Sequence, residues 1–69
     1  MKISARNALK GTVKKVEIGA VNAEVTLEIS PGIEITAIIT KASAETLELA
    51  EGKEAYAIVK SSDVMVAID

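Results

Sequence analysis

The chain has 69 residues, of which 49% are hydrophobic, and its eight basic and ten acidic side chains give a net charge of −2. A single core of this size rarely supplies more than about 3–5 kcal/mol, so such chains usually need disulfides, a metal or partner chains. The absence of cysteine and histidine excludes disulfides, thiolate chemistry, imidazole bases and the common zinc sites. Assembly with other copies is therefore the expected source of additional stability.

The charge balance and the aromatic content also exclude several partners. A negative net charge and a single tyrosine argue against nucleic-acid binding, which needs cations and rings on which bases stack. No apolar run approaches the length of a membrane span. The opening MKISARN has no apolar segment of the signal-peptide kind, so we expect a cytoplasmic protein without nucleic-acid or membrane partners.

The first part of the chain predicts strands, because nine isoleucines and seven valines outnumber four leucines and β-branching favours extended backbone. We expect a short strand at Lys2–Arg6. In the next run, the apolar residues between 13 and 18 change phase by one position across Lys14-Lys15, which indicates a β-bulge. Gly11 precedes this run and is suited to the same bend.

The middle of the chain predicts an antiparallel hairpin. Every odd residue from Val21 to Ile29 is apolar and the even residues are polar, which gives one buried and one solvated face. Pro31-Gly32 reads as a turn, and the alternation resumes from Ile33 to Ile39.

Helical spacing occurs once, in the segment Lys41–Leu49, with Thr40 as the expected N-cap. Two further strands follow, Ala55–Val59 and Val64–Ile68, separated by Ser61-Ser62-Asp63. Five or six short strands with one small helix after the third long strand predict an all-β, OB-like Greek-key barrel that occupies residues 1–69 as one domain. An SH3-like barrel is the alternative, although it does not usually carry a helix at that point.

A second apolar face accompanies the predicted core. On the strands of the second half of the chain, five side chains have the phase expected for solvent: Ile38, Tyr56, Ile58, Met65 and Ala67. Scattered surface apolar residues are normal, but these lie on strands that are expected to be neighbours. Because the small core needs support, we interpret them as a subunit interface of a homo-oligomer.

Catalytic residues are not indicated. The glutamates fall at polar strand positions or on the helix surface, where a solvated face is the simpler interpretation than an acid–base pair. No hydroxyl has a histidine to activate it, and no glycine-rich phosphate loop is present. The sequence therefore predicts a protein that is not an enzyme and that carries no cofactor.

Three short clusters remain, and all of them offer hydrogen-bond donors: residues 4–7 (SARN), 40–43 (TKAS) and 60–62 (KSS). Each has an ordinary structural explanation, as a helix cap, a turn or a surface ion pair. Together, however, hydroxyls, cations and backbone N–H groups suit a small tetrahedral oxyanion. Such a pocket favours a full dianion, because the O–H of a protonated anion finds no acceptor there, at a cost of about 1–3 kcal/mol.

Several motifs extend over nearly the whole chain, from about Ile3 to Ile68. They are SARNALKGTV at 4–13, GAVNAEVTLEI at 19–29 and ITAIITKASAETLELAEGKEAYAIVKSSDV at 35–64. In this combination and order, the sequence closely resembles the molbindin family, the small Mop-domain proteins that bind molybdate.

The resemblance implies an OB-like fold, a homohexamer built as a trimer of dimers, and cytoplasmic storage or buffering of molybdate or tungstate at sites between subunits. It implies that one class of oxyanion site uses Ser4, Arg6, Thr40, Ser43, Lys60 and Ser61, which coincide with the three donor clusters. A second class, near the three-fold axis, is carried over less securely, and our candidates are Gly19, Ala20, Val21 and Asn22 through backbone N–H groups and the Asn22 amide. No metal ion is ligated directly.

Two departures from the family pattern affect this expectation. The hairpin turn is Pro31-Gly32 where relatives often have Gly or Asp before the glycine, which should alter only the turn. Asp63 lies two residues past Ser61 and would repel a dianion if it faced the pocket, so we expect it to point away and to cap the short turn. The alternative function is a molybdate-responsive sensor or interaction module that acts through a partner protein, since Mop domains also occur fused to DNA-binding and transport proteins.

Overall fold

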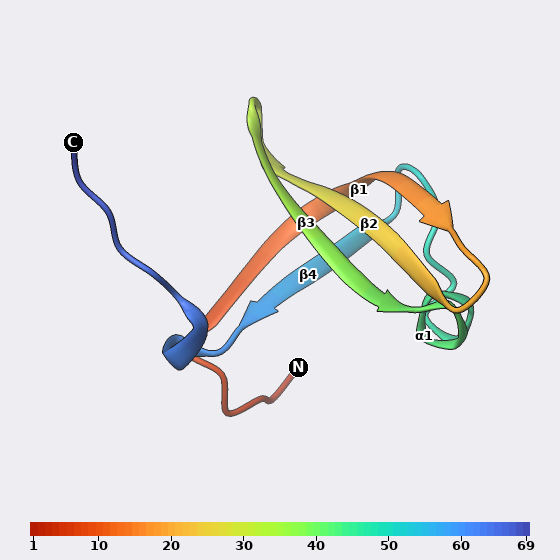
Figure 1. The fold of residues 1–69 in the computed structure, drawn as a ribbon, viewed down its shortest axis with the longest axis horizontal. Helices are drawn as coiled ribbons and strands as arrows, with labels where there is room; N and C mark the ends of the chain where they lie inside the picture. Colours follow the sequence, from red (N-terminus) through yellow and green to blue (C-terminus); the bar gives the residue numbers. More distant parts are fainter.

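All 69 residues are described by a computed structural model. Its elements follow in the order β1 (Asn7–Ile18), β2 (Asn22–Ser30), β3 (Ile33–Thr40), α1 (Lys41–Thr46), β4 (Glu54–Val59) and the 3₁₀ helix η1 (Ser61–Asp63). The strands form one antiparallel sheet in the order β3-β2-β1-β4, curled into a half-barrel (Figure 1). Since β4 returns to lie beside β1 after the β1-β2-β3 meander, the topology is a Greek key. The predicted all-β class with one short helix is confirmed.

The long strand β1 bends where the sequence predicted. The register between β1 and β2 shifts between Val13 and Lys15, which leaves Lys14 as the extra residue of a bulge. The predicted hairpin is also present, with β2 pairing β3 across the turn at Pro31-Gly32. Bulge and twist together curl the sheet around its inner face, which carries the apolar residues of β2.

Gly11 lies in β1 at a point where the backbone of β2 approaches closely. A Cβ at this position would meet the carbonyl oxygen of Glu28 at 2.7 Å, and Gly11 itself is buried. We predict that Gly11→Ala lowers the free energy of unfolding by about 1–3 kcal/mol, because strand β2 would have to move. Urea unfolding at fixed protein concentration measures the change.

Gly32→Ala is the matched control for that substitution. Gly32 has φ +82°, but nothing lies within 4 Å of an added Cβ, so only left-handed backbone strain of about 1 kcal/mol is expected. Wild-type stability in Gly11→Ala would contradict the proposed close approach.

Helix α1 begins as predicted and ends earlier than predicted. The Thr40 hydroxyl caps its first turn by accepting the Ser43 N–H at 3.0 Å. The helix was expected to reach Leu49 but ends at Thr46, because Glu48 adopts φ 53° and the Leu49 N–H bonds back to the Ala44 carbonyl at 3.1 Å. This is a Schellman-type end that directs Leu49 into the core. At six residues, the helix is too short to cross a membrane, and no other helix of the chain is long and apolar enough to do so.

Two predicted strands are absent. Residues 2–6 and 64–68 form no strand, and the sheet has four strands rather than five or six. The segment 64–69 leaves the sheet after η1 and extends away from it (Figure 1), and every residue in it is exposed. Val64, Val66 and Ile68 do alternate as apolar residues, but the segment that contains them pairs with no strand of the same chain.

The core of a single chain is very small. Only six residues are buried, and the central cluster consists of Val13, Val25 and Leu27. An apolar hollow of about 110 Å³ remains open on the inner face of the half-barrel, lined by Val25, Leu27, Ala37, Ile39, Leu47, Leu49, Ala55 and Tyr56. The inner face of the sheet is therefore incompletely covered by this chain alone.

The predicted second apolar face is exposed as expected, with Ile38 at 63% and Tyr56 at 49%.

Candidate functional site

Two of the three donor clusters come together at the start of β1. Asn7, the first residue of β1, pairs with Val59, the last residue of β4, so the segments 4–6 and 60–62 leave the sheet at the same place. Between them lies a hollow of about 410 Å³. Its lining includes four predicted site residues, together with hydroxyl and apolar neighbours: Ile3, Ser4, Ala5, Arg6, Ile58, Lys60, Ser61 and Ser62.

The cations of this hollow differ from those on the outer face of the sheet. Lys10, Lys14 and Lys15 each lie within 4.0 Å of a glutamate, whereas Arg6 and Lys60 form no ion pair. Both of these side chains are exposed. The hollow therefore presents positive charge that no carboxylate of the chain neutralises, together with hydroxyl donors from Ser4 and Ser61. This combination suits a small anion.

The third donor cluster lies elsewhere. Thr40 ends β3, where it pairs with Asn22 at the start of β2, and Ser43 is in the first turn of α1. The Thr40 hydroxyl donates to Ser43 Oγ at 2.8 Å and accepts the Ser43 N–H. Because both roles of the Thr40 hydroxyl are already occupied, the Ser43 O–H is the donor of this pair that can turn to a ligand.

The two donor groups are at opposite ends of one sheet. Strand β1 has 12 residues, so its ends are separated by roughly 35 Å along the strand. Arg6 directly precedes Asn7, where β1 begins. Thr40 pairs with Asn22, which opens β2 just after the turn that follows the other end of β1 (Figure 1). The structure therefore brings Ser4, Arg6, Lys60 and Ser61 together in one chain and places Thr40 and Ser43 apart from them.

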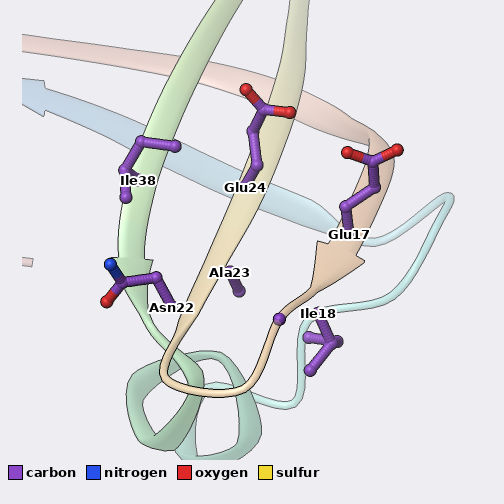
Figure 2. Close-up of a pocket in the computed structure, with 7 residues that line it drawn as sticks. Glu17, Ile18, Asn22, Ala23, Glu24 and Ile38 are labelled. Atoms are coloured by element: carbon purple, nitrogen blue, oxygen red, sulfur yellow. The ribbon is translucent and has the colours of Figure 1, made fainter.

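The second predicted class of site is divided between two hollows. Gly19 and Asn22 line one hollow together with Glu17, Glu24 and Ile38, and Figure 2 shows the two carboxylates on adjacent strands. Lys15 donates to Glu17 and holds the pKa of that carboxyl below its ordinary value, whereas Glu24 forms no ion pair and gives the hollow negative charge. This charge opposes binding of a dianion there.

The other two residues of that class, Ala20 and Val21, line a hollow beside Lys41, Ala42, Glu45 and Thr46. The Gly19 N–H, which was expected to be free for a ligand, donates instead to the Asn22 carbonyl at 2.7 Å. That part of the expectation was wrong, because Gly19 closes the tight β1–β2 turn.

Asp63 does not obstruct the Arg6 hollow. It is the last residue of η1 and is not among the residues that line the cavity, which agrees with the expectation that it points away. The predicted capping role is wrong, because its side chain makes no hydrogen bond. Ser62 lines the hollow although the predicted site did not include it, and its place beside Ser61 in the KSS cluster was the available signal.

The donors gathered in the Arg6 hollow are of the kind that can hold an anion. No group of three or more His, Cys, Asp or Glu side chains could hold a metal ion. A Greek-key half-barrel with clustered, unneutralised donors at the end of its strands defines a small binding module of the OB type.

Comparison with known proteins identifies the family. The TOBE domain model matches residues 3–66. A probable molybdenum-pterin-binding protein of Haemophilus influenzae is 48% identical over the full length of both chains. The molybdenum transport protein ModE of Azotobacter vinelandii is 52% identical, and all of this chain matches only 26% of that protein. The chain therefore belongs to the TOBE domain family.

Solved structures agree with the fold. MopII from Clostridium pasteurianum superimposes with a TM-score of 0.90 at 52% identity, covering 97% of this chain and all of that one. ModG, described as a cytoplasmic molybdate-binding protein, superimposes with a TM-score of 0.89 at 51% identity in a form with molybdate bound. That match covers 94% of this chain and 46% of ModG. The predicted molbindin-like character is confirmed, and the Haemophilus influenzae relative and ModG are described as binding proteins, in agreement with the expectation of a non-enzyme.

Proposed function

We propose that this chain binds molybdate or tungstate in the cytoplasm at sites between the subunits of a homo-oligomer, and that it stores or buffers the oxyanion. The observation that carries the proposal is the separation of the donors: Ser4, Arg6, Lys60 and Ser61 form an incomplete, positively charged hollow at one end of the sheet. Thr40 and Ser43 are at the other end. A site that uses both groups is formed only where two chains meet.

The open half-barrel supports the proposed assembly. Strands β3 and β4 are unpaired edges, and the apolar hollow on the inner face between them is open. The exposed segment 64–69 alternates Val64, Val66 and Ile68, so one of its faces matches such a hollow. We infer that this segment from a second copy fills the opening and that the homohexamer is built from such pairs. When two chains exchange segment 64–69 in this way, η1 and the adjacent Lys60 and Ser61 lie at the boundary between the chains.

The ligand follows from the chemistry of the donors and from the relatives. The ammonium and the guanidinium only donate hydrogen bonds at neutral pH, and each hydroxyl can donate one. A dianion therefore satisfies all of these donors and brings no proton of its own that needs an acceptor. ModG is a molybdate-binding relative at 51% identity. Tungstate has the same charge and a similar size, so this donor set gives little basis for rejecting it.

Thermal unfolding with added oxyanions tests the proposal. A ligand that binds only the folded assembly stabilises it by about 2.7 kcal/mol at a concentration of one hundred times Kd. We predict that molybdate and tungstate raise the melting temperature by several degrees and that sodium chloride at equal ionic strength does not. Unchanged melting with both oxyanions would refute the proposal.

A sensor or interaction module is the second candidate, and the match to one quarter of ModE favours it, because there a similar domain is part of a longer protein. Such a role needs a partner protein whose capture depends on the ligand. Pull-down from a cell extract with and without molybdate distinguishes the two roles, since a store is expected to bring down only its own copies.

A further inference from the structure

One half-buried hydrogen bond joins the two segments that line the Arg6 hollow. The Asn7 Nδ2 donates to the carbonyl oxygen of Val59 at 3.3 Å, across a sequence separation of 52 residues. The other side-chain hydrogen bonds and ion pairs of the chain are all exposed. This contact is therefore the one that water competes with least.

The position of this bond connects it to the donor set. Asn7 follows Arg6 directly, and Val59 precedes Lys60 directly, so each partner is one residue from a cation of the hollow. The pair Asn7–Val59 is also the last rung of the β1–β4 ladder. Beyond this rung, no backbone pairing holds segment 4–6 against segment 60–62.

Asn7 does not line the hollow itself, although Ala5, Arg6 and Lys60 do. Its side chain is directed to the β4 backbone and is not a ligand donor in this geometry. We propose that Asn7 is a positioning residue of the oxyanion site. Its side-chain amide closes the end of the β1–β4 ladder and thereby keeps the segments that carry Arg6 and Lys60 at a fixed distance from each other. This inference rests on the proposed function of the hollow.

The physical effect is preorganisation. Arg6 and Lys60 carry like charge and repel each other when no anion is present, which favours fraying of the last rung. A side-chain bond across that rung opposes the separation, so less ordering is needed when the anion binds. Losing one hydrogen bond of ordinary strength corresponds to a loss of about tenfold in affinity.

Calorimetric titration of the full chain with molybdate tests the assignment. Asn7→Ala should weaken binding about tenfold while native mass spectrometry shows the wild-type oligomer. Asn7→Asp keeps the shape of the side chain but has no N–H to donate, and should weaken binding at least as much. Asn7→Gln keeps the amide donor and should bind more tightly than Asn7→Ala.

Val16→Ala is the control, because Val16 packs against the core and is far from the hollow in the strand. If this variant lost as much affinity as Asn7→Ala at an equal loss of melting temperature, the role of Asn7 would be general stability and the inference would fail. Unchanged affinity in both Asn7→Ala and Asn7→Asp would also overturn it.

Amide hydrogen exchange separates this inference from the proposed function. In Asn7→Ala, exchange at Asp63, whose N–H donates to the Lys60 carbonyl at 2.9 Å, should become faster, while exchange within the β2–β3 hairpin should not change. A wild-type chain that binds no molybdate would refute the proposed function, and the exchange rates would still decide whether Asn7 orders the segment. Unaltered exchange at Asp63 would overturn the positioning role.

Discussion

Arg6→Ala is expected to weaken one class of oxyanion site strongly and to leave the oligomer intact. Arg6 lines the hollow at the start of β1, is exposed and pairs with no carboxylate, so the substitution removes no contact within the chain. Each charge-assisted hydrogen bond to a dianion contributes about 1.5–3 kcal/mol, which corresponds to a loss of roughly 10- to 150-fold in affinity. Calorimetric titration with molybdate measures it.

Lys10→Ala is the matched control, since it removes the same charge from a position four residues further along the chain, within β1. Lys10 is exposed and pairs with Glu54 at 3.2 Å on the outer face, away from the hollow. It should leave molybdate affinity within about twofold, because an exposed ion pair contributes little. Arg6→Lys keeps the charge but loses the planar fork, and should fall between wild type and alanine. Monomers in sedimentation of Arg6→Ala would instead make Arg6 an assembly residue.

The sequence was sufficient to predict those parts of the fold that local chemistry determines. The alternation from Val21 to Ile29 and the Pro31-Gly32 turn produced the hairpin, and the phase change at Lys14-Lys15 produced the bulge. The helix end was missed because a glutamate occupies the left-handed position at Glu48, where glycine is the usual signal. The two terminal strands were predicted but are absent for a different reason: alternation predicts an apolar face, but not which edge pairs with it.

The candidate site was predictable in its chemistry but not in its layout. Residue type identified Arg6, Lys60 and the neighbouring serines as donors, and the antiparallel pairing of Asn7 with Val59 then brought them together. No sequence pattern indicated that Thr40 would lie at the other end of the sheet or that the Gly19 N–H would be used in a turn. Both facts follow from the register of strands distant in sequence, which depends on the whole fold.

Val66→Asp is expected to abolish assembly without unfolding the single chain. Val66 is 90% exposed and belongs to a segment that pairs with nothing in its own chain, so the substitution costs the isolated subunit little. In the proposed exchange, the same side chain enters the apolar hollow of a second copy, where an unpaired carboxylate costs several kcal/mol. Sedimentation should therefore show smaller species, with β-sheet circular dichroism retained.

Loss of assembly in Val66→Asp should also remove the first class of oxyanion site, because Thr40 and Ser43 would no longer reach the hollow that Arg6 and Lys60 line. Ser30→Asp places the same charge at the exposed end of β2, beside the hairpin turn, and should change neither assembly nor binding. Dissociation by Ala67→Asp but not by Val66→Asp would mean that the opposite face of the segment enters the second copy. Full molybdate binding by a monomeric Val66→Asp variant would contradict a site between chains, because the separation of the donors in one sheet would then have no functional consequence.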